Sequence, residues 1–346
     1  MSDLTAEGEI LFQRVETALR ERLPLLDEQH QSAIRLFSGF YEGFPDVLID
    51  LYGATLVIFN YHEKPVVLRP LLIELQKWLL RQFPWITAVV HKTRSIRNMP
   101  SRLGVIRYGD ETSLTTRIVE QGVQYAINLR LNQDASFYLD TRNLRGWLKD
   151  HMAGKSVLNT FAYTGSLGAA ALAGGARRVV QTDHNPRFLE LARETYRLND
   201  WPMNDEDFLV GDFFKVVDGL KRRKQLFDCV ILDPPFFSTG FNGEIFLNEK
   251  TLPLLNKVRP LVAHEGALIV VNNALFMSGT GLIRIFDEGS QSGYLWLDEI
   301  IPVPEDVTGF PNTRVTPPPV DPSPFNHPTK IAILRVARKD RAPASG

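Results

Sequence analysis

Residues 157–183 read VLNTFAYTGSLGAAALAGGARRVVQTD, and this stretch decides the fold that the sequence predicts. Its two apolar runs predict buried strands, and the turn between them leads into a helix at 166–174. Residues 227–237, FDCVILDPPFF, likewise predict a buried strand that ends in polar and turn residues. Ligands bind at the carboxyl ends of parallel strands in open α/β sheets, so both stretches predict a ligand site at one sheet edge.

Strands and helices alternate in the second half of the chain, which is typical of βαβ units and a parallel sheet. We expect strands at 156–160, 178–182, 206–210, 227–232 and 266–272, with helices such as 166–174 and 186–199 between them. Two last strands, 293–303 and 329–337, are joined by a proline-rich loop at 302–328. Because no helix separates them, we expect an antiparallel pair at the sheet edge.

A smaller α+β domain is predicted before this sheet. Its expected elements are a helix at 6–23, strands at 33–37, 46–52, 55–61 and 86–91, a helix at 66–83, and a hairpin of 115–119 with 123–129. The predicted division is an N-terminal helix at 1–30, an α+β domain at 31–130, and an α/β domain at 131–346 that includes the loop 302–328.

The composition is that of a globular protein, with 346 residues, 44% hydrophobic residues and a formal net charge of -1. No global positive charge indicates nucleic acid, although a local patch can suffice. Cys229 is the one cysteine, which excludes an intramolecular disulfide and a cysteine-cluster metal site, and we expect no metal. With no secretory signal and no apolar run of about 18 residues, we expect a cytoplasmic enzyme without a membrane span.

Three residues follow successive predicted strands. Gly165 would let the backbone approach a ligand closely, Asp183 could bind a ribose diol, and Asp212 could accept a hydrogen bond from an adenine amino group. Alternatively, each acid caps a helix or lies in a solvated turn, as Asp183 would before helix 186–199. The dinucleotide fingerprint GxGxxG is absent, which disfavours a nicotinamide dehydrogenase. The pattern predicts a site for S-adenosylmethionine, which has no phosphate.

The sequence Asp233-Pro234-Pro235-Phe236 ends the fourth predicted strand. The prolines stiffen the loop and remove backbone donors, which leaves the Asp233 carboxylate and the Pro234 carbonyl as acceptors for a base nitrogen. Phe236 and Phe237 would stack on a planar base, a contact that contributes roughly 1–3 kcal/mol. The alternative is a strand-ending turn with two buried phenylalanines.

With these motifs, the chain resembles the class I S-adenosylmethionine methyltransferases of large-subunit ribosomal RNA, the group that contains the 23S rRNA cytosine-C5 and guanine-N7 enzymes. Residues 137–145 are similar to the segment that leads into the family's catalytic domain, 159–175 to its glycine-rich motif and 233–236 to its DPP motif. Residues 31–130 also resemble the family's middle domain. The resemblance implies a Rossmann-like sheet and S-adenosylmethionine as cofactor.

By this resemblance, the cofactor pocket would be lined by Phe161, Tyr163, Gly165, Asp183, Asp212 and Asp233. Arg142 would hold the methionine carboxylate or position the segment that contains it; the alternative is a surface arginine at a helix start.

Two features depart from the family pattern. The cytosine-C5 enzymes use a cysteine after the fifth strand as nucleophile. That place reads Val270-Val271-Asn272-Asn273-Ala274 here, and Cys229 lies inside the apolar fourth strand, so we expect no 5-methylcytosine chemistry. The residues before the small domain are also too few for the family's RNA-binding PUA domain, which keeps a small molecule or a protein open as acceptor.

The sequence HKTRSIRNMPSR at 91–102 is the predicted contact for RNA phosphates, through Lys92, Arg94, Arg97 and Arg102. The alternative is a solvated basic loop. His327 in the proline-rich loop could be a base or a stacking group, or a histidine that the loop itself satisfies. The predicted function is methyl transfer to a base nitrogen of RNA, with ribosomal RNA expected. Besides the alternative acceptors, a nicotinamide dehydrogenase and a non-catalytic RNA-binding module remain as alternatives.

Overall fold

The computed structural model describes residues 6–95, 99–235, 237–240 and 243–339, with the backbone alone for the described part of 237–250. The chain forms two compact units. The first combines Met1–Leu139 with Pro304–Pro317, and the second combines Asp140–Val303 with Pro318–Gly346.

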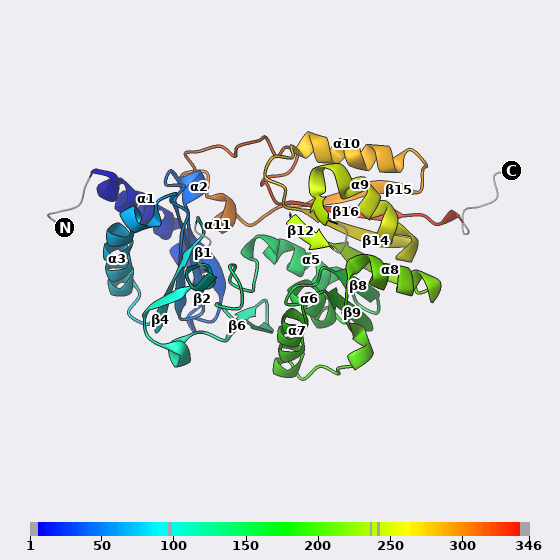
Figure 1. The fold of residues 1–346 in the computed structure, drawn as a ribbon, viewed down its shortest axis with the longest axis horizontal. Coiled ribbons are helices and arrows are strands. Elements are labelled where there is room, and N and C mark those ends of the chain that lie inside the picture. The colour runs from blue at the N-terminus through cyan, green and yellow to red at the C-terminus, as the bar shows by residue number, and fades with distance from the viewer. Residues whose placement is uncertain (1–5, 96–98, 236, 241–242, 340–346) are drawn as a thin grey trace. The chain divides into compact units, whose positions relative to one another are not determined.

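The first unit is built on a five-stranded sheet with the order β1-β2-β3-β4-β5. The strands are β1 Ala33–Ser38, β2 Val47–Tyr52, β3 Thr55–Asn60, β4 Ala88–Thr93 and β5 Val105–Tyr108. Helix α3, Pro65–Gln82, links β3 to its parallel neighbour β4, and the other neighbours pair antiparallel. Helix α1, Ala6–Arg22, and α3 lie on the same face of this sheet (Figure 1), where Leu11, Leu19, Leu72 and Leu79 share one buried core.

Smaller elements complete this unit. They are α2 Gly39–Glu42, α4 Met99–Leu103, the hairpin of β6 Arg117–Glu120 and β7 Val123–Ala126, α11 Glu305–Thr308, and the short 3-10 helices η1 Leu23–Leu25, η2 Glu111–Ser113 and η3 Leu139–Thr141, the last of which crosses the unit boundary. Strand β5 was not expected, because two of its four residues are exposed and it lacks the alternation of a half-buried strand.

Part of the proline-rich loop belongs to the first unit, whereas the whole of 302–328 was expected in the second. The reason is a set of hydrogen bonds that no local pattern reveals. Asp306 O accepts from Arg22 Nη2 at 2.7 Å, and Asp306 Oδ2 accepts from Arg35 N at 3.0 Å. Ser38 Oγ donates to Val307 O at 2.8 Å. The N-terminal helix is likewise part of this unit rather than a separate segment.

The second unit contains a seven-stranded sheet with the order β10-β9-β8-β11-β14-β16-β15. The strands are β8 Ser156–Thr160, β9 Arg178–Asp183, β10 Phe208–Val210, β11 Phe227–Leu232, β14 Val262–Asn272, β15 Leu295–Ile301 and β16 Lys330–Val336. Strands β8 to β11 and β14 are parallel, and β16 pairs antiparallel with both β14 and β15. This order confirms the predicted Rossmann-like α/β class with an antiparallel end.

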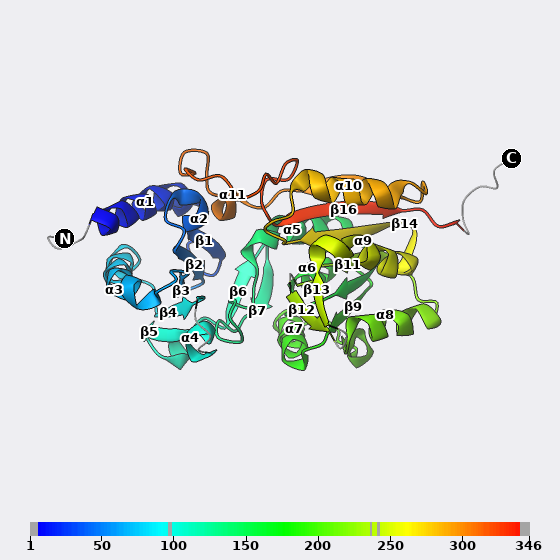
Figure 2. The same cartoon turned by 45° about the horizontal axis from the view of Figure 1, so that its top comes forward.

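Helices pack on both faces of this sheet. They are α5 Arg142–His151, α6 Ser166–Ala173, α7 Pro186–Leu198, α8 Phe213–Arg222, α9 Leu247–Val258 and α10 Gly279–Ser290, with η4 Asp205–Asp207 and η5 Arg259–Leu261 as short 3-10 turns. Val180 of β9 joins the core formed with α8, α9 and α10, three helices that Figure 2 shows near one another. The next residue, Gln181, points to the other face, where its Nε2 donates to Gly165 O and to the Tyr196 hydroxyl.

The second unit also contains a hairpin that the sequence did not predict. An unpredicted hairpin of β12 Phe237–Gly240 and β13 Gly243–Phe246 follows β11. No helix in the described ranges is both long and apolar enough to cross a membrane.

Candidate functional site at the carboxyl edge of the parallel sheet

The parallel strands of the second unit end at a common edge. Thr160 of β8 aligns with Thr182 of β9 and with Leu232 of β11, and Val210 of β10 aligns with Asp183. The residues that follow these strands therefore gather there. They are Phe161, Tyr163, Gly165, Asp183, Asp212, Asp233, Pro234 and Pro235.

The turn after β8 has an unusual backbone. Phe161 and Tyr163 both have φ near 53°, and Gly165 has φ 77°. A left-handed conformation at a residue other than glycine costs on the order of 1–3 kcal/mol and is concentrated at functional sites. The Asp183 carboxylate holds the turn, because its Oδ2 accepts a 2.9 Å hydrogen bond from Tyr163 N.

Gly165 is required for packing within the protein, and its expected role in the approach of a ligand stays a prediction. A Cβ atom there would lie 2.5 Å from Ala192 Cβ and 2.9 Å from Gln181 Nε2. A Cβ atom at Gly168 would overlap the Gln181 side chain. Gln181 also accepts a 2.8 Å hydrogen bond from Asn159 Nδ2, so the glycines make room for a buried amide pair that joins β8 to β9.

Asp183 is buried, with 8% of its surface exposed. Burial raises the pKa of its carboxyl group, against hydrogen bonds from the backbone of Asn185 and Tyr163. Its Oδ1 accepts from Asn185 N at 2.9 Å, and Asn185 itself caps α7 by accepting from Arg187 N. Asp183 therefore does not cap that helix directly. Its Oδ1 also lies 3.3 Å from His184 Nδ1, so Oδ2 is the oxygen with more room for a further donor.

Asp212 is the N-cap of α8, where its Oδ1 accepts a 3.1 Å hydrogen bond from Lys215 N. The helix-cap alternative thus describes this residue, and a contact with adenine stays a prediction. The ring of the next residue, Phe213, stacks on Phe161 with centroids 4.5 Å apart and planes at 23°. This aromatic pair lies beside the strained turn.

Asp233 is the most unusual group at this edge. It is half-buried, and its carboxyl group has no hydrogen-bond partner among the described residues. Burial and the nearby charge of Asp140 raise its pKa to about 8. Pro234 is buried and Pro235 is exposed. A carboxyl group with this pKa can exchange a proton near neutral pH.

Asp140 and Thr329 were not predicted as site residues. Thr329 Oγ1 donates to Asp140 Oδ2 at 2.8 Å, and Thr329 N donates to His327 Nδ1 at 2.9 Å. His327 is therefore satisfied by its own loop, and an acceptor role for Nδ1 places the proton of the neutral ring on Nε2. Asp140 lies in the quoted 137–145 segment, but nothing in that segment alone relates it to Asp233.

Buried amides at the end of β14 were also missed. Asn272 Nδ2 and Asn273 Oδ1 are buried without a partner in the described part of the chain. Next to them on β16, Lys330 is fully buried, and its Nζ donates to Ala274 O at 3.1 Å and Pro328 O at 2.6 Å. The sequence signal that could have revealed these residues was the pair Asn272-Asn273 at the end of an apolar strand, where an apolar residue is more usual.

Four other predicted residues remain to be placed in the structure: Arg142, Phe236, Phe237 and Arg97. Arg142 is half-buried at the start of α5, and its cofactor role stays a prediction. Phe236, the side chain of Phe237, and Arg97 lie outside the described residues.

The predicted phosphate-binding loop is wrong for Lys92, which is fully buried in β4. Its Nζ donates to Leu103 O, Asn132 O and Asp134 O, each at 2.9 Å. Burial lowers its pKa to about 7.

The neighbouring arginines also have internal partners. Arg94 Nη1 donates to Gln133 O at 2.7 Å and to Asp134 Oδ1 at 2.9 Å, and Arg102 donates to Gln133 Oε1. These side chains hold the first unit together, so they are not available as free phosphate contacts.

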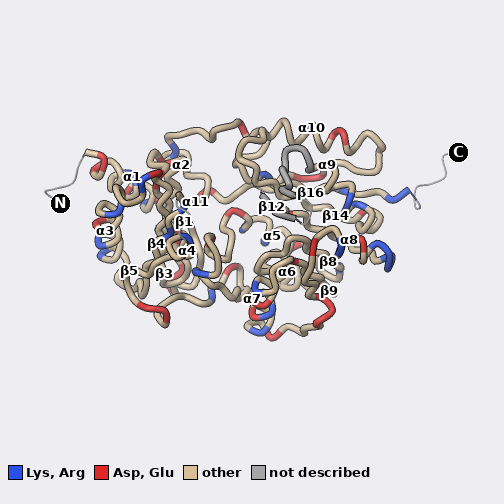
Figure 3. Tube along the Cα trace, viewed as in Figure 1, with Lys and Arg blue, Asp and Glu red and all other residues tan. Residues whose placement is uncertain are grey.

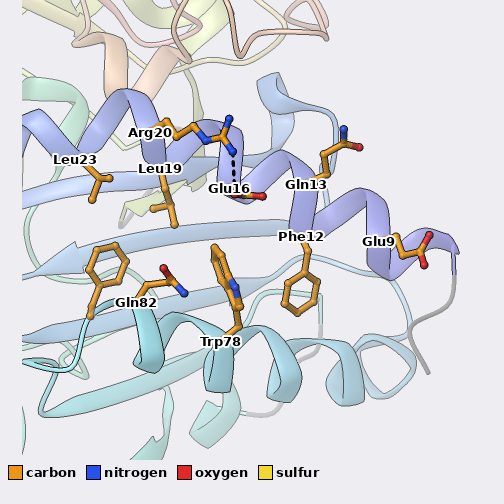
Figure 4. A pocket seen from close by; sticks show the side chains of 10 residues that line it. Glu9, Phe12, Gln13, Glu16, Leu19, Arg20, Leu23, Trp78 and Gln82 are labelled. Carbon is orange, nitrogen blue, oxygen red and sulfur yellow. Dashed lines mark hydrogen bonds and ion pairs between the residues drawn. The ribbon is translucent and has the colours of Figure 1, made fainter. Parts of the chain in front are cut away.

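A groove of about 770 Å³ between α1 and α3 belongs to the first unit. Phe12, Leu19 and Trp78 point into it, with Glu16 bound to Arg20 at its rim (Figure 4). Its lining also includes the polar residues Glu9, Gln13 and Gln82, and none of its lining residues is a predicted site residue. No cluster of three or more potential metal ligands occurs within the described ranges.

Comparison with known proteins gives a consistent family. The sequence model of the S-adenosylmethionine-dependent methyltransferases matches residues 48–288. The "Ribosomal RNA large subunit methyltransferase I" of Aeromonas salmonicida is 30% identical over 234 residues, which cover 68% of this chain and 59% of that protein. The protein of the same name from Aliivibrio fischeri is 28% identical over 239 residues, with the same coverage. The chain thus spans less than two thirds of these relatives.

A solved structure shows the same fold over both units. The crystal structure of SMU.776 complexed with SAH has a TM-score of 0.82, covers 96% of this chain and 83% of its own, and is 21% identical.

Proposed function

Because this chain belongs to the S-adenosylmethionine-dependent methyltransferase family, we propose that it transfers a methyl group from S-adenosylmethionine to a base nitrogen of RNA, with ribosomal RNA as substrate. The observation that carries the proposal is the Asp233 carboxyl group, which lies at the sheet edge without a hydrogen-bond partner among the described residues and has its pKa raised to about 8, first by burial. The family match overturns the dehydrogenase alternative.

The residues at the edge fit the cofactor. Asp183 Oδ2 has a second lone pair for a ribose hydroxyl, and Asp212 has a second oxygen for an adenine amino group. Phe161 and Phe213 offer an aromatic surface, and Arg142 is the proposed partner of the methionine carboxylate. Bound there, S-adenosylmethionine supplies a methyl group that its sulfonium activates, so that the methyl carbon bonds to the acceptor nitrogen as its bond to sulfur breaks.

The acceptor is oriented by the loop after β11. The Asp233 carboxylate and the Pro234 carbonyl accept hydrogen bonds from an amino group and turn its lone pair toward the methyl group. The nitrogen must lose a proton when the new bond forms, and the Asp233 carboxylate takes it and passes it to solvent. A cationic ligand in the crevice lowers the pKa of Asp233 and so favours the carboxylate. Phe236 and Phe237 are the proposed stacking groups.

Nitrogen is preferred over cytosine C5 because the chain offers no suitable nucleophile. Cys229 lies in the middle of β11 with 0% exposure, and burial raises the pKa of its thiol to about 12. A reactive thiol requires a lowered pKa and access to the substrate. We therefore place the chain near the 23S rRNA cytosine-C5 and guanine-N7 group, with nitrogen as the acceptor atom.

Ribosomal RNA is proposed because relatives such as those of Aeromonas and Aliivibrio carry that substrate in their names. An enzyme of ribosomal RNA works where ribosomes assemble, in agreement with the cytoplasmic location that the sequence predicts. A small molecule or a protein is the alternative acceptor, and a non-catalytic RNA-binding module would bind RNA without transferring methyl groups.

The test is incubation with methyl-labelled S-adenosylmethionine and ribosomal RNA from cells that lack this gene. Nucleoside mass spectrometry should find label in an N-methylated base, and Asp233→Ala should abolish it while binding of S-adenosylhomocysteine remains. Label at C5 of cytosine, label only in protein or small molecules, or RNA binding without label would each contradict the proposal.

A further inference from the structure

The end of α8 and the adjoining end of α9 carry a cluster of cations. The cluster comprises Lys221, Arg222, Arg223, Lys224, Lys257 and Arg259, and we call it the basic edge. Figure 3 shows Lys and Arg gathered at the far end of α8. Arg222, Arg223 and Lys224 are exposed, and they form no hydrogen bond or ion pair through their side chains with another described residue.

The cations lie close enough to act on one another. Lys257 Nζ binds Asp218 Oδ1 at 2.6 Å, which joins α9 to α8. This hydrogen bond, with the charges of Lys257, Lys221 and Arg222, lowers the pKa of Asp218. The pKa of Lys221 is lowered by burial and by the charge of Lys257. Asp218 thus faces three cations, which leaves a strong excess of positive charge.

The position of the basic edge in the sheet is well defined. Helix α8 begins at the carboxyl edge, where Asp212 caps it, and its ten residues extend about 15 Å back toward the start of β11. Strand β11 has six residues and spans about 20 Å. The basic edge therefore lies at the amino edge of the sheet, on the order of 20 Å from Asp233.

A helix C-terminus favours a cation, but this effect acts within the last turn and one or two side chains suffice for it. Here, four consecutive cations end α8, two of them beyond its last residue, and Arg259 joins them from a different element. Like charges so placed repel one another and lower the stability of the unit. A binding partner with negative charge gives a physical reason for keeping them.

We propose that the basic edge binds the phosphate backbone of a folded RNA whose target base enters the carboxyl edge of the same sheet. The proposal rests on the proposed function and specifies its substrate. One nucleotide is too short to contact both edges, so the proposed substrate is an RNA of several nucleotides or more rather than a nucleotide or a small molecule. Exposed cations without protein partners are the groups that contact phosphates. These contacts take the place of the predicted loop around Lys92, where Lys92, Arg94 and Arg102 bind groups of the first unit.

The test compares two triple variants with the same change in net charge. The first is Arg222→Gln with Arg223→Gln and Lys224→Gln. The control, on α3 of the first unit, is Arg69→Gln with Lys77→Gln and Arg81→Gln, which are also exposed. Binding to transcribed fragments of large-subunit ribosomal RNA is followed by fluorescence anisotropy between 50 and 300 mM salt, about a sixfold range over which phosphate contacts weaken strongly. Binding of S-adenosylhomocysteine reports whether each variant is folded.

We expect the first variant to bind the RNA roughly 10- to 100-fold more weakly and to reduce the magnitude of the slope of log K against log salt by about 2–3. The control should change affinity less than about threefold. A variant that keeps the charge, Arg222→Lys with Arg223→Lys, should restore most of the affinity, since phosphate contacts depend mainly on charge.

Equal losses in both triple variants, or no loss in the first, would overturn the proposal. So would wild-type binding that is insensitive to salt. Should the first triple variant fail to fold, the Arg-to-Lys variant and the salt slope of the wild type decide in its place. Binding needs no methyl transfer, so wild-type protein that binds RNA through the basic edge but leaves it unmethylated would contradict the proposed function and not this inference.

Discussion

The charge of Asp140 acts on the Asp233 carboxyl group, and burial together with this charge raises the pKa of Asp233 to about 8. Asp140 in turn accepts a hydrogen bond from Thr329 at the start of β16. Asp233 is thus linked electrostatically to Asp140, and Asp140 is linked to Thr329 by a hydrogen bond. This arrangement makes Asp233 a proton acceptor whose strength suits neutral pH.

Asp233→Asn should reduce methyl transfer by about 100-fold or more, because general-base assistance contributes about 10²–10⁴-fold. The amide has almost the same shape and keeps a hydrogen-bond acceptor, but it cannot take up the proton. The rate is measured with methyl-labelled S-adenosylmethionine, and calorimetry with S-adenosylhomocysteine should show cofactor binding within a few-fold of wild type. Unchanged turnover would exclude the proposed role.

Asp140→Asn should shift the pH dependence of the reaction. Removing the Asp140 charge lowers the pKa of Asp233, so the carboxylate forms at lower pH and the acid limb of the rate profile moves down by roughly 1 pH unit. Asp150→Asn, an exposed position on α5, removes the same charge and serves as control. If the pH–rate profile of Asp140→Asn does not shift, the acid limb reports the ionisation of a group other than Asp233.

The stability of the second unit should also depend on Asp233. Its folded pKa of about 8 lies far above the value of about 3.9 for an unfolded aspartate, so the folded state holds a proton that the unfolded state releases. This contribution is fully present below about pH 4 and is lost as the pH rises toward 8. Relative to Asp233→Asn, the wild type should lose at least about 1 kcal/mol of unfolding free energy between pH 5 and pH 8.5. Urea denaturation of both proteins at the two pH values measures this loss of unfolding free energy. The same pH dependence of the unfolding free energy in both proteins would contradict the raised pKa of Asp233.

Gly165→Ala should destabilise the second unit by roughly 3 kcal/mol or more, because the new methyl group meets Ala192 and Gln181 in addition to the left-handed backbone. Gly154→Ala is a matched control, since Gly154 also has a positive φ but a Cβ atom there would meet nothing within 4 Å. It should cost only about 1–2 kcal/mol. Chemical denaturation measures the unfolding free energy of both variants. Equal losses in Gly165→Ala and Gly154→Ala would mean that the Gln181 side chain moves to make room for the new methyl group.

Cys229→Ala should leave methyl transfer within a few-fold of wild type and lower stability by about 1–2 kcal/mol, as expected for a small packed core side chain. The same labelled assay checks the activity. Complete loss of activity in a protein that still unfolds cooperatively would revive a covalent mechanism.

Much of the fold could be predicted because periodic apolar runs are local signals. The strand predicted at 227–232 is β11 with the same bounds, and the antiparallel pairing of β15 with β16 was expected from the missing helix between them. The gathering of residues at the carboxyl edge follows from the parallel sheet alone. Contacts between distant residues could not be predicted, such as Asp140 with Asp233 or Thr329. Lys92 shows the same limit, because a basic segment does not reveal that one of its lysines is a core residue.

The bond between Arg22 and Asp306 has a consequence for synthesis of the chain. Arg22 is fully buried beside Glu42, and one of its donors reaches an acceptor 284 residues later. When the first 139 residues have been synthesised, the buried guanidinium of Arg22 has its acceptors in Ala18, Arg35 and Glu42 but still lacks Asp306 O. The second sheet up to β15 must be synthesised before α11 follows. At about 5–20 residues per second, this interval lasts roughly 10–30 s. During it, the nascent protein is open to chaperones and proteases, and the first unit on its own is expected to be a poor candidate for isolation as a fragment.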